Sequence, residues 1–164
     1  QIMQSKYRVD TFKAVVSMAT VIFCFLMGIS LIIISRYGSA AVFFLIGLIF
    51  LKPLYTYGAT ISIDQQGIVC RFLSKTIKRF TWDEIAEVGV AGTRIFFKKD
   101  SNRTGTLYIY LSKSAMTDED RFQMMLKWPP KDKIFLVYSR KRLESVQMHF
   151  SSKIQTYNAG TLHI

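Results

Sequence analysis

The feature that most constrains this chain is a long apolar run near its beginning. Residues 14–35 include no charged side chain, and about 20 apolar residues are enough for a helix to cross a bilayer. A secretory signal has a shorter apolar core, and a surface helix of a soluble protein shows a polar face. The run has neither property, so the sequence predicts a retained transmembrane helix at about 12–35.

A second apolar segment follows the short interruption Arg36–Ser39. It is uncharged from residue 37 to residue 51 and then meets Lys52 and Pro53. Lys52 could extend its ammonium group toward the headgroups, whereas Pro53 would kink or end a helix. We expect a second span at about 40–57. A re-entrant segment is the alternative that this shorter length leaves open.

Two spans joined by a tight turn place both ends of the hairpin on the same side of a membrane. Three basic residues precede the first span and Lys52 lies at the end of the second, whereas the turn holds only Arg36. The positive-inside rule then predicts a multi-pass protein of the cell membrane with both ends in the cytoplasm. The residues expected at the membrane interface are Lys13, Arg36, Lys52, Tyr55 and Tyr57.

Small residues along the two spans could allow the helices to approach closely. The candidates are Gly28, Ser30, Gly38 and Gly47, which form no GxxxG pair. The chain has two cysteines, Cys24 in the first span and Cys70 beyond the hairpin. This separation predicts no disulfide, and without a Cys/His spacing the sequence predicts no metal site.

Beyond residue 58 the apolar pattern changes to an alternation with period 2, which is typical of strands. Short runs of this kind are separated by turn residues at hairpin spacing. This predicts an antiparallel sandwich or barrel of about seven strands. The expected strands are 60–63, 68–73, 76–82, 86–90, 94–98, 107–111 and 134–138.

Two helices are expected within this region. Thr117 and Asp120 have capping-box spacing and open a helical insertion. Its predicted apolar stripe is Phe122, Met125 and Leu126. Ser139 begins a final helix that extends to about Phe150 and would cover one open end of the barrel. The residues expected on its buried side are Leu143, Val146 and Phe150.

The arrangement resembles the bacterial pleckstrin-homology-like (PH-like) domains over about residues 59–150. The resemblance rests on the strand order, on the segment 80–88 (FTWDEIAEV) and on the terminal helix after Tyr138. The segment 127–130 (KWPP) is similar to membrane proteins of this kind from Gram-positive bacteria. The resemblance implies an α+β chain with a two-helix membrane anchor at 1–58, a PH-like cytoplasmic domain at 59–150 and a tail at 151–164.

The residues that carry out chemistry in enzymes form no recognisable set in this sequence. His149 and His163 are the only histidines, and there is no glycine-rich phosphate loop. Asp118–Asp120 is more simply a set of acidic residues that favour a helix N-terminus than a metal site. We therefore expect a protein that is not an enzyme and holds no cofactor.

Basic residues offer the most suggestive cluster. The net charge is +11, and basic side chains beside a membrane are attracted to anionic headgroups. A merely solvated surface is the alternative. The neutral-to-acidic first turn, 64–67, departs from phosphoinositide-binding PH domains, so only general headgroup attraction is expected. The candidate headgroup contacts are Arg71, Lys75, Lys78, Arg79, Arg140, Lys141 and Arg142, and further basic residues are Lys98, Lys99 and Arg103.

These patterns predict a non-enzymatic, membrane-anchored binding or scaffolding module that assembles with a protein partner or with itself at the cytoplasmic face. One alternative is the binding of anionic lipid headgroups, and another is an accessory subunit of a transporter or other membrane complex. Nucleic acid is not an expected partner. Tyr108 and Tyr110 could stack on bases, but strand alternation explains them more simply.

Overall fold

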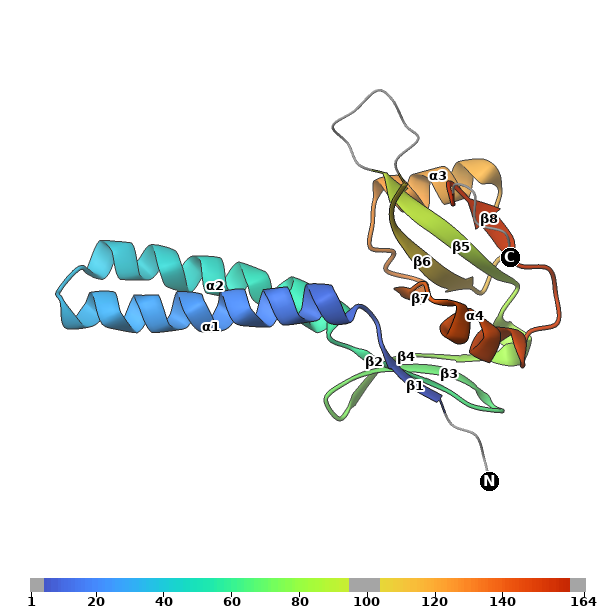
Figure 1. Cartoon of the computed structure of the whole chain (residues 1–164), viewed down its shortest axis with the longest axis horizontal. Coiled ribbons are helices and arrows are strands. Elements are labelled where there is room, and N and C mark those ends of the chain that lie inside the picture. The colour runs from blue at the N-terminus through green and yellow to red at the C-terminus, as the bar shows by residue number, and fades with distance from the viewer. Residues whose placement is uncertain (1–4, 95–103, 160–164) are drawn as a thin grey trace. The chain divides into compact units, whose positions relative to one another are not determined.

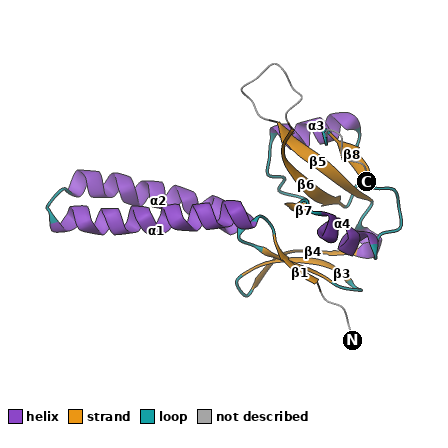
Figure 2. Ribbon diagram, viewed as in Figure 1, coloured by secondary structure: helices purple, strands orange, loops and turns teal. Residues whose placement is uncertain are grey.

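The computed structural model describes residues 5–94 and 104–159 (Figures 1 and 2). The helical elements are α1 (Thr11–Ile33), α2 (Tyr37–Tyr57), η1 (Trp82–Glu84), α3 (Asp118–Leu126) and α4 (Arg140–Gln147). The strands are β1 (Ser5–Arg8), β2 (Thr60–Ile63), β3 (Gly67–Phe72), β4 (Lys75–Thr81), β5 (Glu87–Arg94), β6 (Thr104–Ser112), β7 (Ile134–Val137) and β8 (Gln155–Tyr157).

The chain divides into two compact units. The hairpin unit contains Arg8–Thr60 together with Phe72–Ser74, which comprises the last residue of β3 and the turn to β4 and is called the β3–β4 turn below. The β unit contains the remaining described residues, including most of the strands and both short helices α3 and α4. The β3–β4 turn therefore groups with the apolar helices, although the strands on either side of it belong to the β unit.

Both predicted apolar helices form. Asp10 caps α1, since its side chain accepts a hydrogen bond from the Lys13 amide at 3.1 Å. The expectation that Pro53 could end the second helix is wrong, because α2 continues through it to Tyr57. The proline nitrogen has no hydrogen to donate to the Ile49 carbonyl. One lost bond near the end of a long helix is not enough to stop it.

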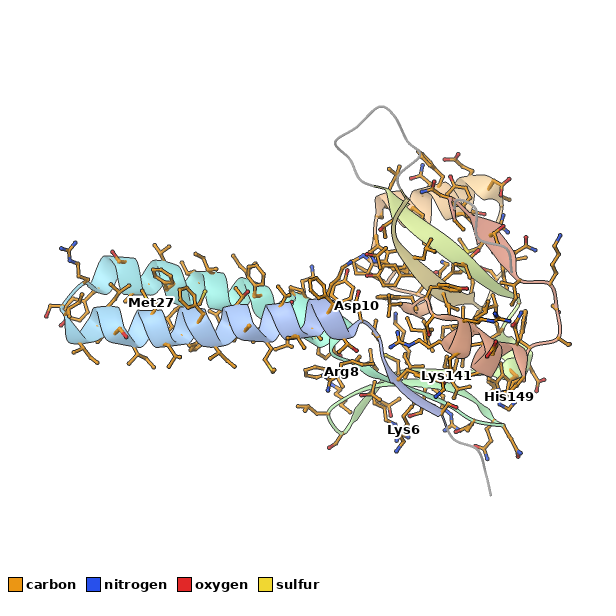
Figure 3. All side chains as sticks on the ribbon, in the orientation of Figure 1. Lys6, Arg8, Asp10, Met27, Lys141 and His149 are labelled. Carbon is orange, nitrogen blue, oxygen red and sulfur yellow. The ribbon has the colours of Figure 1, made fainter. Side chains whose placement is uncertain are left out.

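The two helices are long and apolar enough to cross a membrane, with mean hydropathies of 2.5 and 1.8 in their most apolar stretches. Only 17% and 11% of these stretches are buried, whereas the core helix of a soluble protein is mostly buried. Figure 3 shows that the side chains along the hairpin are almost entirely carbon, with nitrogen and oxygen near its two ends. The exposed surface of the hairpin is thus the kind that suits lipid.

Small residues line the contact between α1 and α2. The buried positions are Ala14, Ser17, Cys24 and Gly28 on α1, and Ala40 and Gly47 on α2. The Phe44 ring lies against Gly28 and the Phe25 ring against Gly47, and the two rings meet edge to face at 5.4 Å. Of the four small residues singled out in the sequence, only these two glycines are in the contact. Ser30 is exposed, and Gly38 has no neighbour within 4 Å of a Cβ placed on it.

The β unit contains two four-stranded sheets, in the orders β1-β2-β3-β4 and β7-β6-β5-β8. The fold is α+β as expected, but the sheets are not closed into a barrel and eight strands are described rather than seven. β1 lies in the stretch that the sequence assigned to the anchor. β8 lies in the predicted tail and pairs in parallel with β5, so the second sheet is mixed rather than purely antiparallel.

The central strand β5 is longer than its sequence pattern indicates. Ala91–Gly92 was expected to end it, but the strand pairs with β6 through both residues. Gly92 is required there because a Cβ would collide with the carbonyl oxygen of Asn158, just after β8. The Asn158 amide also donates to the Gly92 carbonyl at 3.0 Å. The predicted strand 94–98, with Lys98, Lys99 and Arg103, lies almost wholly outside the described residues.

The core of the second sheet is buried on both faces. Tyr108, Ile109, Tyr110 and Leu111 of β6 are each 0% exposed, so these tyrosines offer no ring face to a base. On α4, the expected inward residues Leu143 and Val146 are buried, as predicted. Phe150 is also buried, but it lies beyond the helix, which ends at Gln147 rather than at about Phe150. On α3, the expected stripe is confirmed only at Met125, because the helix buries Arg121 and Met124 beside it and leaves Phe122 half-buried. Leu126 is 40% exposed.

Candidate basic surface

The first sheet places basic side chains on its outer face by simple alternation. In β1, the Tyr7 hydroxyl bonds the Ser145 hydroxyl of α4 at 2.8 Å, so the neighbouring Lys6 lies on the opposite face and is exposed (Figure 3). In β4, Phe80 is buried, whereas Lys75 and Arg79 are exposed. The outer basic face, as we define it, consists of Lys6, Arg71, Lys75 and Arg79, all of which are exposed.

Lys78 is separated from this face although the sequence placed it there. Its ammonium group donates to the Lys133 carbonyl at 2.6 Å, and the side chain is half-buried. Burial lowers the pKa of Lys78, although nearby Cys70 and Asp132 act in the opposite sense. Lys78 therefore belongs to the contact between β4 and the segment before β7.

The three basic residues of α4 also have different surroundings. Arg142 donates to the Val137 carbonyl at 2.9 Å and lies over the Tyr7 ring at 5.5 Å, so it ties α4 to β7 and β1. Arg140 pairs with Glu144 at 3.1 Å at an exposed position, where such a pair adds little stability. Lys141 is exposed. The predicted set of seven is thus divided between surface and interior positions.

The predicted interface residues lie at the two ends of the hairpin unit. Arg36 is the residue before α2, its side chain makes no capping hydrogen bond, and it is exposed. At the other end, the Lys13 ammonium group lies over the Tyr57 ring at 4.9 Å and Lys52 is exposed. The Tyr55 ring contacts Phe72 of the β3–β4 turn, with the ring centroids 4.9 Å apart.

A buried ionic cluster joins α3 to the second sheet, and sequence reasoning missed it. Glu87 of β5 accepts hydrogen bonds from the Arg121 guanidinium at 3.0 Å to each of its oxygens. It also accepts from the Tyr110 hydroxyl at 2.6 Å and from the Met116 amide at 2.8 Å. Arg121 also pairs with the exposed Asp118. The available signal was the acidic Glu87 immediately before the apolar stretch 88–92 of β5.

The protonation of Glu87 should affect the stability of the β unit. Burial alone would raise the pKa of Glu87, but hydrogen bonds from Arg121, Tyr110 and Met116 together hold it below its ordinary value of 4.5. A depressed folded-state pKa gives stability that is present above about pH 4.5 and lost as the pH falls through the folded pKa.

We therefore expect the midpoint temperature of thermal unfolding to decrease as the pH is lowered below about 4.5. Tryptophan fluorescence of the detergent-solubilised protein measures this temperature. The decline should be shallower in Glu87→Gln, which cannot gain this proton. An identical pH dependence in both proteins would contradict this role of Glu87.

A half-open groove of about 580 Å³ lies beside α3. It contains both signs of charge, since Asp120 and Asp132 face a surface that also includes Lys127, Lys131 and Lys133. Its remaining lining residues are Ser114, Ala115, Met116, Gln123, Met124 and Pro130.

The described residues contain no group of three or more His, Cys, Asp or Glu side chains that could hold a metal ion. His149 stacks on Trp82 at 5.1 Å, and the Trp82 indole donates to the Asp64 carbonyl at 2.8 Å, so this histidine is part of a packing contact. Comparisons with protein-family models, curated proteins and solved structures find no match for this chain. The functional argument therefore rests on the residues themselves.

Proposed function

We propose that this protein is a non-enzymatic, membrane-anchored module whose β unit binds anionic lipid headgroups at the cytoplasmic surface. The observation that carries the proposal is the charge of the first sheet. Its four strands contain six basic residues and no acidic one. Four of the six form the outer basic face, and each Lys or Arg near an anionic surface contributes about 1 kcal/mol of attraction.

The hairpin supports this proposal because a membrane-spanning hairpin would tether the first sheet to the bilayer. A tether raises the effective concentration of the second contact, so weak headgroup attraction can still be productive. The basic residues around the outer ends of α1 and α2 favour the cytoplasmic side. The resemblance to PH-like domains remains part of the proposal, and it is supported only by the hairpin strands and the helix that follows Tyr138.

The anchoring step predicts that the protein stays in the membrane pellet after alkaline carbonate extraction. A reporter fused after Ile164 should be active only in the cytoplasm. Release by carbonate would contradict integration, and activity only outside would contradict the topology.

The headgroup step is tested on the full chain, because a fragment that starts at residue 59 would lack β1. Acylation of lysines by an amine reagent is measured in nanodiscs with and without phosphatidylglycerol. We expect Lys6 and Lys75 to react more slowly when the anionic lipid is present, and more salt should weaken the difference. Lys131, exposed in the groove, is the matched control. Equal rates in both lipids would contradict headgroup binding.

A second candidate function is protein assembly, which the groove beside α3 favours. Its mixed charges and half-open form suit a short extended segment of a partner. Purification in mild detergent followed by mass determination tests this function. A stable complex that is lost in Asp132→Lys would support it, whereas a lone monomer would contradict it.

A further inference from the structure

The β3–β4 turn presents an exposed leucine in an unusual backbone conformation. Leu73 is 89% exposed, and its φ of +52° lies in the left-handed region. Tight hairpin turns require this conformation, but glycine or asparagine usually supplies it. A single exposed leucine is ordinary. Leu73 is both exposed and held in a backbone conformation that leucine disfavours, and this combination suggests a role beyond folding.

The turn belongs to the hairpin unit through contacts at the end of α2. Phe72 packs on Tyr55, and a Cβ at Gly58 would lie 3.4 Å from the Phe72 ring. Tyr55 is itself 42% exposed, two residues before α2 ends at Tyr57. If α2 spans the bilayer, aromatic residues here lie at headgroup depth. The contact with Tyr55 therefore holds the turn at the same depth.

The residues next to the turn have the charge that an anionic surface attracts. Arg71 precedes Phe72 and Lys75 follows Ser74, and both are exposed. Arg8 is an exposed residue of β1 that belongs to the hairpin unit. It adds a third positive charge at the end of the hairpin where α1 begins and α2 ends. An apolar tip between basic residues is the composition of a segment that lies in the membrane interface, with its apolar side chain in the acyl boundary and its charges among the headgroups.

We propose that the β3–β4 turn is a second membrane contact, in which Leu73 inserts into the interface of an anionic bilayer beside the end of α2. This inference rests on the proposed function, because it requires α2 to span the membrane. It adds a specific insertion site to the general attraction of the basic face. The contact would fix the first sheet at the bilayer surface instead of leaving it on a free tether.

The test places an environment-sensitive fluorophore on Leu73→Cys in the full chain, reconstituted in phosphatidylcholine vesicles with and without phosphatidylglycerol. The control is Gln65→Cys, which is exposed in the β2–β3 turn. The native cysteines are buried, and burial raises the pKa of the Cys70 thiol to about 11. Brief labelling at neutral pH therefore favours the introduced thiol, and the unmodified protein measures the background.

We expect blue-shifted emission at position 73, and quenching by a lipid with a nitroxide near the top of its acyl chain. Neither effect should occur at position 65. Both effects should weaken without phosphatidylglycerol, or when Arg71→Gln and Lys75→Gln are combined with Leu73→Cys. Equal exposure to water at 73 and 65 in carbonate-resistant protein would overturn the insertion and leave the anchor intact. Release by carbonate would overturn the anchor, and the insertion with it.

Discussion

Replacing Glu87 by alanine is expected to lower the free energy of unfolding of the β unit by about 3–5 kcal/mol. The substitution leaves the Arg121 guanidinium in a position where its side chain is only 11% exposed, with its buried counter-charge removed. It also removes the acceptor of the Tyr110 hydroxyl and the Met116 amide. A buried charge that loses its partner costs more than the pair contributes, because water cannot replace the lost contacts.

Chemical unfolding of the detergent-solubilised full chain measures this loss. Both tryptophans lie in the β unit: Trp128 is 4.6 Å from the Tyr108 ring and Trp82 stacks on His149. Their fluorescence therefore reports on this unit alone. The matched control is Asp118→Ala, which removes the other carboxylate on Arg121 from a side chain that is 88% exposed. A loss of less than about 1 kcal/mol is expected there.

Glu87 and Arg121 should also be coupled in a double-mutant cycle. Combining Glu87→Ala with Arg121→Met removes both charges, so the double variant should lose less stability than the sum of the single variants. Additive losses would mean that the two side chains act independently, which would contradict the cluster as the link between α3 and the sheet.

The elements governed by local rules could be read from the sequence. The apolar runs predict α1 and α2, and the capping residues Thr117 and Ser139 stand at the starts of α3 and α4. Long-range pairing has no such signal. β8 contains only three residues and forms by pairing with β5, and the pattern of β1 is too short to stand out beside the apolar run that follows it.

The difference between local rules and long-range pairing also explains which residues of the basic surface could be predicted. Sequence clustering grouped Lys78 with Arg79 because they are neighbours, but alternation sends them to opposite faces of β4. It also missed Lys6, which becomes part of the outer basic face through the pairing of β1 with β2. The inward face of α3 was shifted because Arg121, normally a surface residue, is held by Glu87. A buried ion pair between distant residues cannot be inferred from hydrophobic period.

The second large effect is expected in the hairpin, from Gly28→Leu. A Cβ at Gly28 would lie 2.8 Å from the Phe44 ring, so the larger side chain forces the ring or the helix to move. Overpacking of this kind costs about 1–3 kcal/mol. Lipid provides no hydrophobic drive to hold the helices together, so close packing and the short turn must supply the association. Loss of the Gly28–Phe44 contact should therefore separate α1 from α2.

Spin labels on the exposed residues Ile22 and Ile49 measure this separation in nanodiscs, in a Cys24→Ala background. Gly28→Leu should lengthen and broaden the distance distribution between the labels. Gly38→Leu is the matched control, since Gly38 has no neighbour within 4 Å of an added Cβ, and its distribution should stay unchanged. If both variants leave the distances unchanged, the glycine–phenylalanine contact does not hold the hairpin closed. In that case the turn at Ile34–Arg36 would be sufficient to keep α1 and α2 together. It joins the two helix ends covalently, while the rest of the contact between the helices is free to adjust.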